Sequence, residues 1–298
     1  MAGKKAVRAA VVSHKGCVRG NNEDNFFFNG DFMLIQDMNE GAVIEHAFSD
    51  KFQVFGIFDG MGGGDSGERA SSIATQILQN YYLKLEKGDV LKTLKEYAYK
   101  ANDIIVEDGK KCNADSQGTT MAVLVLKGDQ AYVSNVGDSR IYLLRDGALS
   151  QLSMDHSVVG QLVREGRLTE EQARKSPNNN IITNFLGMPP EEMVSKFVYQ
   201  ITDKAMQGDR FLICSDGLCD MLSNASIRKE LMSYAAPGEC ARQLVLTAME
   251  MGGKDNVTCM IIDIGEFQTL PCTDKETKAD SDLLEDGEDD ENTVLVNR

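Results

Sequence analysis

The sequence has no long apolar run, and this absence excludes a membrane-spanning helix. No stretch approaches the ~18 continuous apolar residues that such a helix needs. The start, MAGKKAVRAAVVSHKG, contains basic residues but no apolar segment before a small-residue cleavage site, so we expect no secretory signal. Together these two features predict a cytoplasmic protein that does not bind membranes.

Histidine and cysteine lack the spacings of common catalytic and metal motifs. The three histidines form no HExxH motif, and no serine lies in a GxSxG turn. None of the seven cysteines is in a CxxC pair, and no Cys/His spacing fits a zinc site. Cys214, Cys219 and Cys259 lie in or beside apolar, strand-like runs. They are expected to be buried free thiols, which suits a reducing cytosol.

Positive charge is also in short supply. The chain has 31 Lys and Arg against 46 Asp and Glu, a net charge of -15, which argues against a nucleic-acid binder because nothing offsets phosphate repulsion. Residues 273–298 carry much of the acidity, are poor in aromatics and lack sustained periodicity. We therefore predict a folded domain over residues 1–268 and a disordered acidic tail over 269–298.

What the sequence does contain is a series of apolar runs of strand length. They cover residues 52–58, 119–126, 130–136, 140–144, 210–214 and 258–264. Gly128-Asp129 separates one pair of runs and Asp146-Gly147 follows another, and both dipeptides suit hairpin turns. The runs therefore predict antiparallel sheet.

Three segments show helical periodicity. Apolar residues recur at helical spacing over Glu68 to Leu85 and over Val90 to Val106. A further helix is expected over Glu239 to Met251. Two consecutive helices inserted among antiparallel strands predict a layered α+β fold, with helices packed outside a sheet or sandwich.

The most informative segment is FGIFDGMGGGDSGERA, residues 55–70, where an apolar strand is expected to end at Asp59 and a helix to follow the glycines. Three interpretations compete. A P-loop fails on charge, because Glu68 occupies the place of the phosphate-binding lysine. A dinucleotide loop needs a following parallel strand, whereas the next predicted element is a second helix. A metal loop fits, because Asp59 and the bare carbonyl of Gly60 can face a hard cation.

Carboxylates recur at the ends of other predicted strands. Taken singly, each is better explained as a turn or cap residue. Together they can converge on one rim of a sandwich and form the oxygen-rich site that Mn²⁺ and Mg²⁺ favour, with waters completing the shell. These residues are Glu23, Asp24, Asp138, Asp216 and Asp255. Metal-activated water is then the best available nucleophile.

The ordered set of motifs resembles the PPM family, the PP2C-type protein phosphatases, particularly its bacterial members. The resemblance covers about residues 8–265 and is carried by SHKGCVRGNNED, FDGMGG, GTT at 118–120, NVGDSR, the DHS of 155–157, CSDGL and DNVT. It implies a four-layer α-β-β-α sandwich, with two central antiparallel sheets flanked by helix pairs. It also implies a protein serine/threonine phosphatase that acts on phosphorylated proteins and opposes a serine/threonine kinase.

The resemblance assigns metal-binding roles residue by residue. It implies that Asp59 contacts both of two Mn²⁺ or Mg²⁺ ions and that Gly60 gives its carbonyl to one of them. Asp216 and Asp255 are then expected to bind the other ion. Asp138 is similar to the aspartate that helps to hold a third metal in bacterial relatives.

The same resemblance assigns the catalytic roles. Asp24, with Glu23, is similar to the carboxylates that hold metal-bound water, so Asp24 counts with both the metal-binding and the catalytic residues. Arg19 is expected to bind the substrate phosphate through forked hydrogen bonds. Met61 stands where animal members often have a histidine proposed as general acid. A metal-bound water is therefore the expected donor of the leaving-group proton.

Two rival functions stay open. A catalytically inactive member would be a regulatory binding module, but the intact set of aspartates argues against it. An aspartyl-phosphate phosphatase would use Asp59 as nucleophile and normally a second aspartate two residues later, where Met61 stands. The segment 156–190 resembles the variable flap of bacterial members; the alternative is a long connection with one helix.

Overall fold

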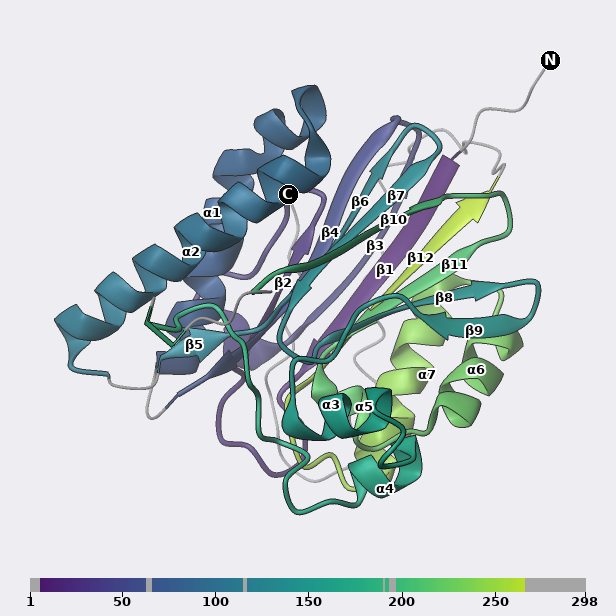
Figure 1. The fold of residues 1–298 in the computed structure, drawn as a ribbon. Coiled ribbons are helices and arrows are strands. Elements are labelled where there is room, and N and C mark those ends of the chain that lie inside the picture. Colours follow the sequence, from purple (N-terminus) through teal and green to yellow (C-terminus); the bar gives the residue numbers. More distant parts are fainter. Residues whose placement is uncertain (1–5, 63–65, 115–116, 190, 193–196, 266–298) are drawn as a thin grey trace.

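The computed structural model describes residues 6–62, 66–114, 117–189, 191–192 and 197–265. Two antiparallel sheets face each other at its centre, and helices cover both outer faces (Figure 1). The expected four-layer α-β-β-α sandwich is therefore confirmed. The predicted acidic tail lies outside the described residues, so it stays a prediction.

The first sheet has the strand order β3-β1-β12-β11-β8-β9. Its strands are β1 (Ala6–His14), β3 (Ala42–Phe48), β8 (Arg140–Arg145), β9 (Ala148–Gln151), β11 (Arg210–Cys214) and β12 (Val257–Gly265). Strands β1 and β12 pair along their whole length, with Ala6 opposite Gly265 and His14 opposite Val257. This pairing brings the chain just after β1 beside the chain just before β12.

The second sheet has the order β10-β7-β6-β4-β2, and the short strand β5 pairs with the end of β4. These strands are β2 (Asp24–Phe28), β4 (Phe52–Met61), β5 (Gly118–Thr119), β6 (Met121–Lys127), β7 (Gln130–Val136) and β10 (Tyr199–Lys204). Both predicted hairpins are confirmed, since β6 pairs with β7 and β8 with β9. Asp146 and Gly147 have φ angles of 50° and 75°, the left-handed region that tight hairpin turns use.

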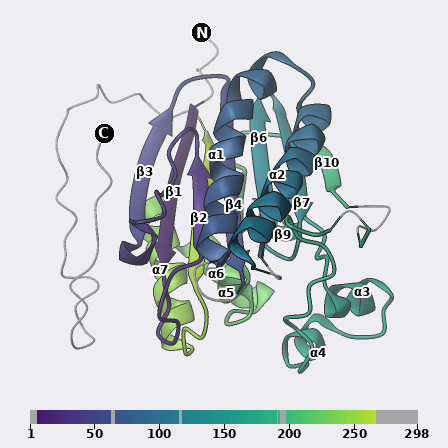
Figure 2. The ribbon, with the colours of Figure 1, turned by 90° about the vertical axis from the view of Figure 1, so that its left-hand side faces the viewer.

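Helices cover each sheet from outside. The second sheet carries α1 (Ser66–Lys87) and α2 (Val90–Cys112), and the first carries α5 (Asp216–Cys219), α6 (Asn224–Ser233) and α7 (Pro237–Glu250). Two short helices, α3 (Val158–Arg164) and α4 (Glu170–Arg174), extend beyond the sandwich at one end (Figure 2). None of the described helices is long and apolar enough to cross a bilayer.

Strand β4 shows why the central strands read as unbroken apolar runs. Its side chains alternate, so Phe55 and Ile57 pack between the two sheets while Val54 and Phe58 pack under α1 and α2. Both faces of the strand are covered, so both need apolar residues. A third apolar cluster joins the first sheet to α5, α6 and α7 and contains the three buried free thiols expected from the sequence.

Several predicted boundaries differ from the structure. The expected strand end at Asp59 is wrong, because β4 continues to Met61, where Gly60 pairs with Thr119 of β5. Helix α2 continues past Val106 to Cys112. It ends there because Asn113 adopts a left-handed conformation and caps the helix by donating its N–H to a carbonyl of the last turn.

Candidate metal centre

Strand pairing brings the predicted acidic residues to one rim of the sandwich. Asp24, at the start of β2, lies directly opposite Asp59 on β4. Asp138 follows β7, Asp216 begins α5 after β11, and Asp255 lies just before β12. Burial raises the pKa of Asp59 well above its ordinary value, and the charges of the other four aspartates raise it further. Each of these four carboxylates is therefore close enough to Asp59 to repel its charge.

Burial is the main cause of the raised pKa values in this cluster, and neighbouring carboxylates add to it. The pKa of Asp24 is raised to about 7 by burial. Burial, and then the charge of Asp155, raises the pKa of Asp138 to about 7. Burial, and then the charge of Asp138, raises the pKa of Asp216 well above its ordinary value. Divalent cations offset this kind of repulsion, so the donor set fits Mn²⁺ or Mg²⁺.

Two buried oxygens support the same reading. Among the described residues, the Oδ1 atoms of Asp24 and Asp138 have no hydrogen-bond partner, although Oδ2 of Asp24 accepts from Ser215 Oγ at 2.7 Å. A buried acceptor without a partner is costly, so these oxygens suit a cation or a water. No three His, Cys, Asp or Glu side chains of the described residues are close enough to enclose an ion. Waters would therefore complete the shell, as Mg²⁺ allows.

The backbone beside Asp59 is held in place by close packing that requires glycine. A Cβ atom on Gly60 would lie 2.2 Å from the carbonyl oxygen of Gly67 and 2.6 Å from that of Glu23. The Gly60 N–H donates to the same Glu23 oxygen at 3.1 Å. The Asp59 N–H donates to Thr120 Oγ1 at 3.0 Å. The described part of the metal loop predicted from sequence is thus a closely packed strand end at which Gly60 is buried.

Arg19 and Glu23 lie at the edge of the same cluster. Arg19 is in the connection between β1 and β2, and its Nη2 donates to Asp255 Oδ2 at 2.7 Å. The Arg19 side chain is 47% exposed, so its guanidinium is open to solvent next to the carboxylates. The Glu23 side chain is buried, and burial followed by the charge of Glu68 raises its pKa to about 7.

Sequence reasoning missed three polar residues at this rim. Glu68 is buried in the first turn of α1 and accepts a hydrogen bond from the side chain of Asn21. Ser215 lies between the two sheets, where its Oγ donates to an aspartate of β2 and accepts from a backbone N–H of β12. Asn256 donates hydrogen bonds to backbone carbonyls of the loop 15–22, called here the Arg19 loop. Ser215 and Asn256 directly adjoin predicted ligands in the sequence, and that adjacency is the signal that could have found them.

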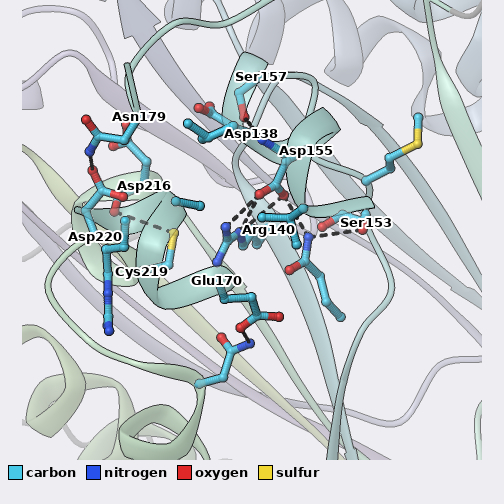
Figure 3. Close-up of a pocket in the computed structure, with 18 of the residues that line it drawn as sticks. Asp138, Arg140, Ser153, Asp155, Ser157, Glu170, Asn179, Asp216, Cys219 and Asp220 are labelled. Atoms are coloured by element: carbon cyan, nitrogen blue, oxygen red, sulfur yellow. Dashed lines mark hydrogen bonds and ion pairs between the residues drawn. The ribbon is translucent and has the colours of Figure 1, made fainter. Parts of the chain in front are cut away.

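A cavity of about 600 Å³ opens beside the carboxylates, with Asp138 and Asp216 in its wall (Figure 3). Its other side is formed by α3 and α4, which belong to the segment 156–190, called here the flap segment. Asn179 Nδ2 donates to Asp220 Oδ2 at 3.0 Å, which ties this segment to α5 across the cavity (Figure 3).

An ion pair fixes the base of the flap segment. Arg140, at the start of β8, donates from Nε and Nη2 to the Asp155 carboxylate at 3.0 and 2.6 Å (Figure 3). Ser157, which follows, caps α3 by accepting from the Gly160 N–H at 3.2 Å. The alternative of a long connection with one helix does not fit, since the described part of the segment contains both α3 and α4.

The fold and the rim together define a class: an α-β-β-α sandwich that gathers carboxylates for divalent cations, as metal-dependent phosphatases do. The protein phosphatase 2C family model matches residues 30–257. The chain belongs to this family, and the resemblance found in the sequence is confirmed.

Named relatives agree with the family. The chain is 32% identical over 283 residues to the serine/threonine protein phosphatase PstP of Mycobacterium tuberculosis, covering 93% of this chain and 49% of the relative. It is 30% identical over 262 residues to the serine/threonine phosphatase stp of Listeria innocua, covering 86% and 96%. The chain therefore spans about half the length of the mycobacterial relative and nearly all of the other.

A solved structure of a relative has the same fold and contains two metal ions. The crystal structure of the PstP catalytic domain in complex with two manganese ions matches with a TM-score of 0.71 at 30% identity. The match covers 88% of this chain and 99% of that one. The fold of this chain is therefore shared with a protein that binds two manganese ions.

Proposed function

We propose that this protein hydrolyses phosphoserine and phosphothreonine esters of other proteins at a site for two divalent cations. The observation that carries the proposal is the convergence of five aspartates on one rim, beside a solvent-facing arginine. Support comes from the relatives, which are named serine/threonine phosphatases, and from the manganese complex of one of them.

The proposal gives each predicted ligand a place. Asp59 would contact both cations, Gly60 would offer its carbonyl to one, and Asp216 and Asp255 would hold the other. Asp138 would hold a third ion. When bound, the cations supply Lewis-acid activation of a water and compensation of phosphoryl charge.

The remaining steps belong to side chains of this protein. Asp24 and Glu23 accept hydrogen bonds from the attacking water and orient it toward phosphorus. Arg19 donates forked hydrogen bonds to the phosphoryl oxygens and offsets their charge during in-line displacement. As the bond from phosphorus to the water oxygen forms, Asp24 accepts the proton that this water loses and the ester bond to the serine or threonine oxygen breaks. A water in the site would protonate the leaving oxygen, and no covalent phosphoenzyme forms.

The proposal extends to the boundaries and partners expected from the sequence. Residues 1–268 form the catalytic domain, and 269–298 form an acidic appendage. The flap segment and its cavity receive the substrate residues that adjoin the phosphorylated side chain. The substrates are phosphoproteins of a cognate serine/threonine kinase in the cytoplasm, and the buried free thiols Cys214, Cys219 and Cys259 fit that compartment.

Hydrolysis of p-nitrophenyl phosphate and of a phosphothreonine peptide tests the proposal in Mn²⁺, in Mg²⁺ and in EDTA. We expect turnover with either cation and none in EDTA. Turnover that persists in EDTA, or no turnover with any divalent cation, would contradict the proposal. Mass spectrometry of the enzyme during turnover distinguishes direct attack by water from the aspartyl-phosphate mechanism. Phosphate found on Asp59 would rule out direct attack.

A further inference from the structure

Arg19 lies in an irregular loop between β1 and β2, so its position depends on the contacts that hold this loop. Strand β1 ends at His14 and β2 begins at Asp24, so Arg19 lies in the connection between them. Its side chain is 47% exposed and its guanidinium contacts Asp255. Side-chain packing cannot fix a guanidinium this exposed. Its distance from the carboxylates therefore follows from the path of the loop, residues 15–22.

Asn256 lies buried beneath this loop and uses both ends of its amide to hold it. The residue is 4% exposed. Its Nδ2 donates to the carbonyl oxygens of Lys15 and Asn21, at 2.9 and 2.8 Å. Its Oδ1 accepts from the Glu23 N–H at 2.9 Å. One side chain thus joins the two sides of the loop to each other and to the start of β2.

The same residue adjoins the carboxylates on the other sheet. Asn256 directly follows Asp255 and precedes β12. A Cβ atom on Gly217 would lie 2.0 Å from the Asn256 carbonyl oxygen, so the turn that follows Asp216 packs against the Asn256 backbone. A shift of Asn256 would therefore move the Arg19 loop relative to both aspartates.

Other contacts hold parts of the loop separately. The Cys17 N–H donates to the Gly253 carbonyl at 2.8 Å, and the Asn22 N–H donates to Asn39 Oδ1 at 2.7 Å. These bonds would remain in a variant that lacks the Asn256 amide. The loop should then stay attached while its two sides lose their common anchor.

We propose that Asn256 is a positioning residue that sets the distance between Arg19 and the cation-binding carboxylates, and so tunes phosphate binding. The kinetic part of its test rests on the proposed phosphatase activity, and a second measurement does not.

Asn102 supplies a matched control. It is 1% exposed, its Nδ2 donates to the Met188 carbonyl at 3.0 Å, and its Oδ1 accepts from the N–H groups of Gly187 and Met188. Asn102→Ala therefore removes the same kind of buried amide from a different loop. This variant therefore measures how much KM changes when a buried, hydrogen-bonded amide is lost away from the Arg19 loop.

The kinetic test is a double-mutant cycle on the full chain with Mn²⁺ and p-nitrophenyl phosphate. We expect Asn256→Ala to raise KM about tenfold, because a small misplacement of a phosphate-binding group has large effects. In an Arg19→Ala background the same change should alter KM by less than about twofold, since both variants remove one function. Asn102→Ala should leave KM for p-nitrophenyl phosphate within about twofold in either background, because this substrate lacks the neighbouring residues that the flap segment is proposed to receive.

Two kinetic results would overturn the inference. One is a KM increase for Asn256→Ala that is equal with and without Arg19. The other is an unchanged KM in a folded Asn256→Ala protein. If that variant does not fold, Asn256→Ser takes its place in the cycle, because a hydroxyl retains one of the hydrogen-bonding groups.

Hydrogen exchange supplies the measurement that needs no turnover. Asn256→Ala should raise amide exchange across residues 15–22 about tenfold or more, whereas Asn102→Ala should raise it near 187–188 instead. Unchanged exchange over 15–22 in the folded variant would overturn the inference. If the unaltered protein shows no turnover, the proposed function is wrong. The hydrogen-exchange experiment can still be interpreted in that case, because it does not depend on turnover.

Discussion

Asp59 shows at the scale of one residue how a metal site opposes stability. Burial raises its pKa, and so do the charges of Asp216, Asp24, Asp255 and Asp138. A carboxyl group whose pKa is higher in the folded state favours folding at low pH and loses that contribution as pH rises through the folded pKa. At neutral and higher pH its charge therefore works against folding unless a cation offsets it.

Asp59→Asn should separate activity from stability. The amide keeps the shape but removes both the metal ligand and the repulsion, so Mn²⁺-dependent hydrolysis of a phosphopeptide should fall by about 10²-fold or more. Thermal unfolding in EDTA at pH 8 should occur at the same temperature as in the unaltered protein, or higher. Full activity of the variant would contradict the assignment of Asp59 as a metal ligand. A large drop in its unfolding temperature would contradict the claim that the Asp59 charge is repelled by its neighbours.

His156 illustrates the opposite sign of pH dependence. Burial, and then the charge of Arg164, lowers its pKa to about 4. Its Nδ1 accepts from the Gly137 N–H at 3.1 Å, a bond that needs the neutral ring. Between pH 6.5 and 4 the unfolded chain binds a proton here that the folded chain does not. Stability from this residue is therefore full above pH 6.5 and is lost as pH falls.

His156→Asn should flatten that dependence. Asn retains an acceptor for the Gly137 N–H but does not titrate. On lowering the pH from 7.5 to 5, the unaltered protein should lose about 2 kcal/mol more unfolding free energy than the variant. Urea denaturation of both proteins at the two pH values gives the loss of unfolding free energy in each. Subtracting one loss from the other removes the contribution of the carboxylates, because both proteins contain them. Parallel pH profiles would show that the ring also protonates in the folded state.

At the scale of elements, the first turn of α1 packs on the metal loop through two glycines. The carbonyl of Gly67 lies so close to Gly60 that a Cβ there would be 2.2 Å away. A Cβ on Gly67 would in turn lie 2.6 Å from Oε1 of Glu23. The helix can approach β4 this closely only because neither position has a side chain.

Gly67→Ala should therefore displace the Glu23 carboxylate while the helix stays in place. We expect kcat with p-nitrophenyl phosphate to fall about tenfold, with an unfolding free energy lower by about 1–3 kcal/mol. Gly20→Ala is the control for stability, because a Cβ there meets nothing within 4 Å. An unchanged kcat in Gly67→Ala would mean that the position of Glu23 does not matter for turnover.

At the scale of the whole molecule, the site exists because two sheets end at the same rim. The second sheet contributes Asp24 and Asp59. In the first sheet, Asp216 follows β11 and Asp255 lies just before β12. Ser215 connects them, since its Oγ donates to Asp24 at 2.7 Å. The separation of the ligands is therefore set by the packing of apolar side chains between the sheets.

Removal of residues 273–298 tests whether the domain is complete without the acidic segment. Strand β12 ends at Gly265, so the deletion leaves every described strand intact. The shortened chain should hydrolyse a phosphothreonine peptide within about twofold of the full chain, since every described element and every predicted site residue remains. A large loss of rate would contradict the boundary proposed at residue 268.

Local patterns were enough for much of the architecture. The predicted runs 130–136 and 210–214 coincide with β7 and β11, because most of each strand is buried and its buried positions are mainly apolar. The hairpin turns followed from dipeptides that tolerate left-handed backbone. Strands β1, β3 and β10 were not among the predicted runs. Much of β3 and β10 is exposed or only partly buried, so neither has a strong apolar pattern.

Side-chain chemistry and local periodicity were enough to predict which residues could bind a hard cation and which segments would form many of the strands and helices. Which of these groups meet depends on how the strands pair and pack in three dimensions. The pairing of β1 with β12 brings Asn256 under the Arg19 loop across more than two hundred residues. No local pattern encodes such contacts, because they arise when apolar faces of distant strands bury one another and bring their ends to a common rim.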